Sequence, residues 1–460
     1  MENVNPDASN VNPIALLFLL LMGLVVWQGS RRSAVQAFLA TAAFLPLGQQ
    51  IVVFGLHFQF FRILILTGLL RAAARGEVRG LKINAIDKLF IIWALTVAIC
   101  GALRDPSAIF GLRCLGGAFN AFGTYFLIRI LIRDLDDVIA HVRFLSLAAI
   151  LIAIPMAWEN FAHKNVFSVF GGVPDLTDER AGRFRCQGPF EHPILAGTFA
   201  ATLLPLLVGL WFTGSRHKVL AFGGIIACVF CSYAAASSGA LMTCVTALAG
   251  LFLWSWRLQM RWVRRGMLAL LVGAALVMKA PFWYIIARLS DQVGGTGWHR
   301  AYLIDQAIGH FSEWWLVGTS VTAHWAPSGQ VLAVDPNSMD ITNNYIAQGI
   351  QGGLLGLCMF VAIIIGCFRV VGHLVRRHDL PIPHKLIWAF GVSLACHCIA
   401  MISISYFDQI QVFWFWLLAV FATLSVLQRR RVAAASMLER APAASSLSGI
   451  PTAPPVEIYQ

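Results

Sequence analysis

The sequence predicts an all-α, polytopic transmembrane protein. Of its 460 residues, 58% are hydrophobic and only 12% are charged, whereas about 25% of the residues in a soluble domain are charged. Many apolar runs reach the length of about 17–25 residues that crosses a bilayer as a helix. Lysine and arginine also gather in alternate loops, as they do in multi-pass membrane proteins. We therefore expect a bundle of about 12–13 spans, with a large loop on one side that contains short amphipathic helices.

Thirteen apolar runs define the predicted spans. The second and third are the least regular, because Pro46, Gly48, Gln49 and Gln50 interrupt them; together they are also compatible with a short hairpin. The runs lie at 13–29, 34–52, 57–72, 85–103, 108–130, 141–158, 192–213, 218–236, 239–256, 266–282, 344–368, 386–404 and 410–427.

The basic residues predict the orientation of these spans. In the thirteen-span arrangement, 24 of the 34 Lys and Arg residues fall on one side, which the positive-inside rule assigns to the cytoplasm. The N-terminus is then expected outside, and its acidic Glu2 and Asp7 are not typical of a cleaved signal peptide. The net charge of +12 is explained by this topology and by attraction to anionic lipid, so it does not indicate nucleic-acid binding.

Three regions are expected along the chain. Residues 1–140 form N-terminal transmembrane helices, residues 141–427 form a transmembrane core with long outside loops at 159–191 and 283–343, and residues 428–460 form a disordered cytoplasmic tail rich in Ala, Pro and Ser. The second loop has apolar residues at helical spacing from Trp298 to Phe311. This amphipathic helix either rests on the bilayer surface with Trp anchors or covers a cleft as a lid.

One stretch outside the predicted spans carries the groups for binding an anion. Arg183 and Arg185 precede a Gly188-Pro turn, and Glu191 and His192 follow it at the entry to a span. The planar guanidinium group matches phosphate oxygens in a bidentate manner. The stretch therefore predicts a site for a phosphorylated, membrane-bound substrate, and the alternative is a solvated loop.

Several short motifs resemble a known family. They are Arg185-Cys-Gln-Gly188-Pro-Phe190-Glu-His192-Pro193, Ser237-Ser238-Gly239-Ala240, Arg300 with Gly318 downstream, and Asn343-Asn344-Tyr345-Ile346 before Gly352-Gly353-Leu354-Leu355-Gly356. Over roughly residues 140–425 the chain is similar to the O-antigen ligase and polysaccharide polymerase superfamily of bacterial inner-membrane proteins. Two positions depart from the family pattern: Ser238 replaces the usual Arg, and Asn343 stands where ligases have a His before Asn.

The resemblance implies a GT-C-like glycosyltransferase in the bacterial cell inner membrane, with its active face in the periplasm. Its donor would be a glycan on undecaprenyl diphosphate and its acceptor another glycan lipid, in the biosynthesis of O-antigen lipopolysaccharide or exopolysaccharide. Flippase and chain-length-regulator proteins are the protein partners that such a function implies. No cofactor and no metal are expected, because fixed cations can stabilise the departing diphosphate. Arg185 and Arg300 are the predicted catalytic cations, with Arg183 in support.

The general base is left open by the sequence. Glu191, His192, His324, Asp335 and Asp340 are candidates, of which Glu191 and His324 are our predicted catalytic residues. The predicted substrate-binding residues are Arg183, Gly188, His192, Asn343, Asn344 and Trp298.

The type of reaction is also open. Because Asn343 replaces the ligase His, and because Trp298, Trp314, Trp315 and Trp325 offer faces for stacking on sugar rings, a polymerase is favoured over a ligase to the lipid A core. A transporter or flippase of lipid-linked glycans is the alternative of a different class, and a non-catalytic scaffold is a third.

Overall fold

The computed structural model describes residues 11–53, 56–104, 108–180, 182–291, 297–326, 337–377 and 383–440. Within these ranges the chain is almost entirely helical, with two small antiparallel hairpins. The main helices are α1 (Pro13–Gln28), α2 (Arg31–Phe44), α3 (Phe60–Ala74), α4 (Ala85–Arg104), α5 (Ala108–Leu131), α6 (Leu135–Ala162), α7 (Pro193–Trp211), α8 (Lys218–Ala234), α9 (Ser238–Phe252), α10 (Met260–Val277), α14 (Asn344–Arg376), α15 (His384–Ser403) and α16 (Gln409–Arg440).

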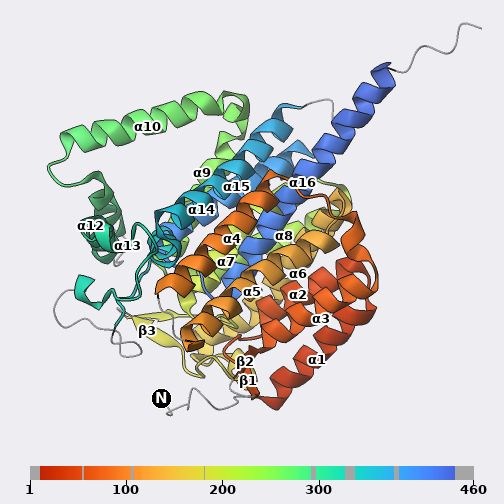
Figure 1. Ribbon diagram of the computed structural model, residues 1–460, viewed down its shortest axis with the longest axis horizontal. Helices are drawn as coiled ribbons and strands as arrows, with labels where there is room; N and C mark the ends of the chain where they lie inside the picture. Colours follow the sequence, from red (N-terminus) through yellow and green to blue (C-terminus); the bar gives the residue numbers. More distant parts are fainter. Residues whose placement is uncertain are drawn as a thin grey trace, which may run out of the picture.

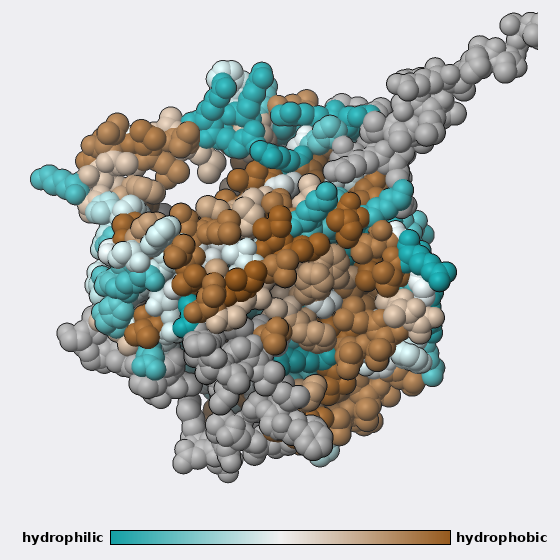
Figure 2. Space-filling model, in the orientation of Figure 1, coloured by the Kyte–Doolittle hydropathy of each residue, from teal (hydrophilic) through white to brown (hydrophobic). Residues whose placement is uncertain are grey.

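Eight helices in the described ranges are long and apolar enough to cross a membrane, which supports a multi-pass, all-α membrane protein. They run side by side as a bundle (Figure 1). Helix α7 lies at its centre, packed against α6, α8, α9 and α15, and nearly all of its residues are buried. The outer helices expose large apolar side chains such as Leu20 on α1 and Leu103 on α4, and hydrophobic side chains cover much of the face in Figure 2.

The region of the second and third predicted spans differs from the expectation. Helix α2 ends at Phe44 rather than continuing toward residue 52, because Pro46 and Gly48 cannot continue a helix. The chain then forms a hairpin of β1 (Gln50–Val53) and β2 (Leu56–Gln59), which pair antiparallel before α3 begins. The same segment is therefore a helix followed by a β-hairpin, not an uninterrupted span.

The predicted basic side of the membrane corresponds to one end of the bundle. Arg32 forms an ion pair with Asp137 across the α2–α6 interface. Arg71 pairs with Glu77 at 3.1 Å, and the Arg133 guanidinium donates to the backbone carbonyl of Glu77 at 2.8 Å. The first three basic loops therefore meet at the same end, as the alternation of charge requires.

The large loop contains its own short helices, as predicted. They are η5 (Phe282–Tyr284), α11 (Ile285–Asp291), α12 (Gly297–Gly309), α13 (Phe311–Trp314) and η6 (Ala323–Trp325). A small hydrophobic core joins α12, α13 and η6 and is formed by Leu303, Ala307, Trp314, Trp325 and Met339. Because Trp314 and Trp325 are buried in this core, they are not available to stack on sugars, which corrects that part of the sequence interpretation.

The large loop is joined to the bundle at a kink in α14. Gly353 has a φ of +63°, and a Cβ there would overlap the backbone carbonyl of Leu316. The amide of Leu354 donates to the carbonyl of Trp315 at 2.7 Å, and that of Thr319 donates to Ile350 at 3.0 Å. Glycine is required at the kink because it tolerates positive φ and allows two backbones to approach closely.

The last two features concern the periphery. Helix α10 stands away from the bundle (Figure 1) and buries none of its side chains completely.

Helix α16 continues to Arg440, so residues 428–440 of the predicted disordered tail are helical. The segment from Val432 to Arg440 is rich in Ala, Leu, Met, Glu and Arg, all strong helix formers. The rest of the predicted tail, 441–460, lies outside the described residues.

Candidate functional site

The turn between Arg185 and Phe190 is held in place by buried groups from other elements. The Glu159 carboxylate, near the end of α6, accepts hydrogen bonds from the amides of Gln187 and Gly188, both at 2.9 Å. The Asn165 side chain donates to the carbonyl of Gly188 at 2.8 Å. Gly188 itself has a φ of +56°, a conformation that glycine adopts readily. The turn is therefore fixed before any substrate arrives.

The entry to α7 completes this scaffold. The Gln409 side chain, at the start of α16, donates to the carbonyl of Pro189 at 2.7 Å, and the Phe190 ring is fully buried. His192 is the N-cap of α7, where its Nδ1 accepts from the amide of Ile194 at 3.2 Å. This bond places the proton of the neutral imidazole on Nε2. Burial, the nearby Arg185 charge and Arg180 keep the pKa of His192 below its usual value, so the ring is neutral at pH 7.

Arg185 lies on a short hairpin made of β3 (Asp178–Arg180) and β4 (Arg183–Arg185). It is directly opposite Asp178 in the register, and its Nη1 donates to the Asp178 carboxylate at 3.0 Å. The side chain is buried, yet its Nε has no hydrogen-bond partner among the described residues. Burial lowers the pKa of Arg185, an effect that Asp178 only partly offsets. The Asp178 carboxylate therefore satisfies only part of the hydrogen-bonding capacity of this guanidinium.

Arg300, on α12, is the most unusual charge in the described part of the chain. It is only 7% exposed, and no hydrogen bond or ion pair to a described residue accompanies it. Burial, with the positive charge of Arg180, lowers the pKa of Arg300 to about 10. A buried cation without a counterion is costly, so this arrangement favours the binding of an anion.

The large loop and the hairpin meet at this point. The Arg180 charge acts on Arg300, Arg185 and His192, so these four side chains share one electrostatic environment although they come from three separate elements. Arg183 is placed differently: its guanidinium lies over the ring of Tyr233, 5.7 Å from the centroid. The structure thus places Arg185 and His192 close together and adds Arg180, which sequence reasoning did not single out and whose charge also acts on Arg300.

A pair of carboxyl groups lies at the end of the same turn. Asp408, in the left-handed conformation just before α16, lies close enough to Glu191 to feel its charge. Burial and the Glu191 charge raise the pKa of Asp408 to about 8. Asp408 therefore keeps its proton at pH 7. Asp408 lies more than two hundred residues from Glu191 in the sequence, and no motif around it indicated this contact.

The remaining predicted site residues have structural contacts of their own. Asn343 is the N-cap of α14 and accepts from the amides of Tyr345 and Ile346, while the Asn344 side chain accepts from the amide of Tyr406 at 3.0 Å. Trp298 is half-exposed and stacks on Tyr302 with ring centroids 5.0 Å apart.

His324 and two other candidate bases lie elsewhere or outside the described ranges. His324 forms an ion pair with Glu313 at 3.0 Å in a separate cluster of the large loop, which also includes His310. His310 follows α12 ten positions after Arg300, a separation of about 15 Å along a helix. Asp340 accepts through its backbone carbonyl from His299, and Asp335 lies outside the described residues.

No protein-family model, curated protein or solved structure matches this chain.

Proposed function

We propose that the protein is a membrane glycosyltransferase that uses a glycan on a polyprenyl diphosphate, of the undecaprenyl type, as its donor. The observation that carries the proposal is the buried guanidinium of Arg300, which has no partner among the described residues and feels the charge of Arg180, a charge that also acts on Arg185. Two or more fixed cations at the end of a helical bundle suit a diphosphate on a lipid. The family resemblance of the motifs around Arg185 and Asn343 supports the same reading.

The proposed reaction is a direct displacement. An acceptor hydroxyl attacks the anomeric carbon of the donor sugar, the new glycosidic bond forms, and the bond to the diphosphate oxygen breaks. Negative charge grows on the departing diphosphate, where Arg185 and Arg300 stabilise it. Such preorganised charges are most effective when they are shielded from water, as both are here.

The hydroxyl proton needs an acceptor, and the Glu191–Asp408 pair can supply one. Glu191, next to the protonated Asp408, is the carboxyl group proposed to take up this proton. The pair sits at the end of the turn that carries Arg185, so base and cation belong to one rigid unit. His192 is neutral and uses Nδ1 as a helix cap, which favours a role in binding substrate oxygens through Nε2.

A polymerase that extends one lipid-linked glycan with another remains our preferred reaction. The ligase-type His is absent at Asn343, which caps α14 instead. Among the predicted stacking residues, Trp298 and Trp315 are the two that are substantially exposed and could stack on the sugar rings of a growing chain.

The test uses the purified full chain in liposomes without any ion gradient, supplied with an undecaprenyl-diphosphate-linked glycan. Arg185→Lys and Arg300→Lys keep the charge but lose the bidentate fork, and we expect each to lower turnover by about 10²-fold or more. Arg288→Lys, at an exposed arginine of α11, is the matched control and should keep its activity.

The products separate the possible functions. Longer chains on the lipid carrier indicate a polymerase, and transfer to lipid A core indicates a ligase. Movement of the glycan across the bilayer without any new glycosidic bond would show a transporter and reject the proposal.

A further inference from the structure

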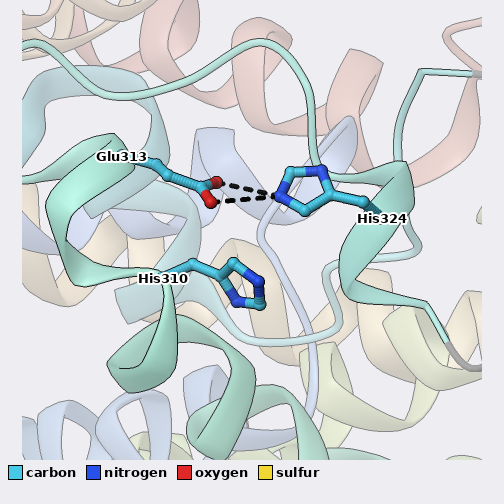
Figure 3. A group of neighbouring side chains, drawn as sticks. All are labelled: His310, Glu313 and His324. Atoms are coloured by element: carbon cyan, nitrogen blue, oxygen red, sulfur yellow. Dashed lines mark hydrogen bonds and ion pairs between the residues drawn. The ribbon is translucent and has the colours of Figure 1, made fainter.

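Three potential metal ligands meet in the large loop, away from the arginine site. They are His310, between α12 and α13, Glu313 on α13, and His324 on η6, and one ligand atom of each lies within 4.8 Å of those of the others. Figure 3 shows the two imidazoles and the carboxylate gathered around one point, with the Glu313–His324 contact drawn. The cluster faces solvent on one side, because Glu313 and His324 are exposed.

The groups around these side chains orient them as metal ligands are usually oriented. The Nδ1 of His310 lies 3.0 Å from the carbonyl oxygen of Gln306, and since a carbonyl only accepts, Nδ1 must donate. The Nε2 of His310 is then the nitrogen with a free lone pair. Metal-binding histidines commonly donate their other ring nitrogen to a carbonyl or carboxylate in this way.

Trp325 fixes the other side of the cluster. It is fully buried, its ring stacks on His310 with centroids 5.3 Å apart, and its Nε1 donates to the Glu313 carboxylate at 3.2 Å. The carbonyl of Trp325 accepts from Tyr302 on α12 at 2.9 Å. The three potential ligands are thus attached to the small core of the loop, and not to mobile surface chain.

We propose that His310, Glu313 and His324 form a binding site for one divalent transition-metal ion of the zinc class. Two imidazoles and one carboxylate are a ligand set that zinc accepts, with a fourth position left for water or another donor. The ion would occupy the place of the proton now shared by His324 and Glu313, and would accept the lone pair of His310 Nε2. A hydrogen-bonded His–Glu pair involves His324 and Glu313 alone, whereas His310 adds a second imidazole to the same cluster and keeps the lone pair of its Nε2 free.

A bound ion would stabilise the fold of the large loop. The three ligands come from the end of α12, from α13 and from η6, so one ion would tie together the elements that surround the small hydrophobic core. It would lie about 15 Å from Arg300 along α12. The proposal therefore stands apart from the glycosyltransferase chemistry, and neither depends on the other.

The test measures metal binding directly. The full chain is purified in detergent, stripped with a chelator and titrated with Co²⁺, whose visible absorption reports a site of low coordination number. We expect one Co²⁺ per chain, displaced by Zn²⁺, and a rise in the melting temperature of the protein with Zn²⁺. His310→Ala and Glu313→Gln should each weaken Co²⁺ binding by at least about tenfold, whereas His373→Ala, at an exposed histidine of α14, should not.

Two results would overturn the proposal: absence of a saturable Co²⁺ signal in the wild type, or equal binding by the wild type and both site variants. Retention of the wild-type proteolysis pattern by the variants shows that a loss of binding is not a loss of folding. His324→Gln provides a third, independent variant in case His310→Ala does not fold.

Discussion

Replacing Arg300 by methionine should make the ligand-free protein more stable while abolishing its activity. The buried guanidinium has no counterion among the described residues, and another positive charge, Arg180, is nearby. Methionine is shorter than arginine, but its unbranched apolar chain can occupy the space of the arginine stem and carries no charge, so the cost of desolvation is removed. Replacing buried ionic groups by apolar side chains of similar volume often stabilises a protein by about 1–4 kcal/mol.

The pKa of Arg300 gives the expected magnitude. Burial and the Arg180 charge lower this pKa from 12.5 to about 10, and each tenfold change in an acid constant corresponds to about 1.4 kcal/mol. The charged side chain therefore destabilises the ligand-free fold by about 3 kcal/mol. Since the pKa of a base is depressed, the folded state releases its proton more readily than the unfolded state. The cost is thus fully present at every pH below about 10.

The assay is thermal unfolding of the purified protein in detergent at pH 7. Arg300→Met should melt a few degrees above the wild type, while Arg288→Met, at an exposed position, should melt close to it. Adding undecaprenyl diphosphate should raise the melting temperature of the wild type and leave Arg300→Met unchanged. If Arg300→Met melts lower than the wild type and still responds to the lipid, Arg300 has a structural partner and the reasoning fails.

Three further predictions concern the scaffold. The pKa of Asp408 is raised from 3.8 to about 8, so between these pH values the folded state holds a proton that the unfolded state lacks. The stability of the protein should therefore fall as pH rises from about 4 to about 8. The melting temperature of Asp408→Asn should depend less on pH than that of the wild type, and an equal pH dependence would contradict the raised pKa. Glu159→Gln can accept only one of the two amide hydrogen bonds, and we expect denaturant unfolding to show a loss of about 1–3 kcal/mol, with no change arguing against the clamp. Gly353→Ala should cost about 1–3 kcal/mol because of its positive φ and should speed proteolysis of the large loop, whereas Gly372→Ala, in open space on the same helix, should do neither.

Much of the architecture was predictable because it follows from local patterns. Apolar runs and their lengths located α4, α6, α7 and the C-terminal helices, and helical spacing located α12 in the large loop. The sequence left a short hairpin open at this place but did not reveal its β structure, because Ile51, Val52 and Val53 continue an apolar run and periodicity alone does not separate a strand from a helix over a short stretch. Residues 428–440 were missed because their composition favours helix continuation and the Ala-rich character was attributed to disorder.

The candidate site was only partly predictable, for a different reason. Arg185 was visible because it precedes a Gly-Pro turn at the entry to a predicted span, and Arg300 because it belongs to the family-like motifs of the large loop. Their partners were not visible, because the contacts join distant parts of the chain: Glu159 reaches the Gly188 turn from α6, and Asp408 reaches Glu191 from the start of α16. Trp325 was predicted to offer an exposed face for stacking on sugars, but it is buried in the core of the large loop. The sequence pattern alone does not distinguish a buried tryptophan of a loop from an exposed one.

The two arginines belong to different parts of the chain. Arg185 belongs to a turn that Glu159, Asn165 and Gln409 anchor to the bundle. Arg300 belongs to the large loop, which contacts the bundle through backbone hydrogen bonds at the Gly353 kink and through side chains such as Trp314 and Arg104. An anion bound between the two parts would offset the desolvation of Arg300 and hold the loop against the bundle at the same time. Substrate binding and loop docking would then be coupled, with the lipid diphosphate as the missing counterion.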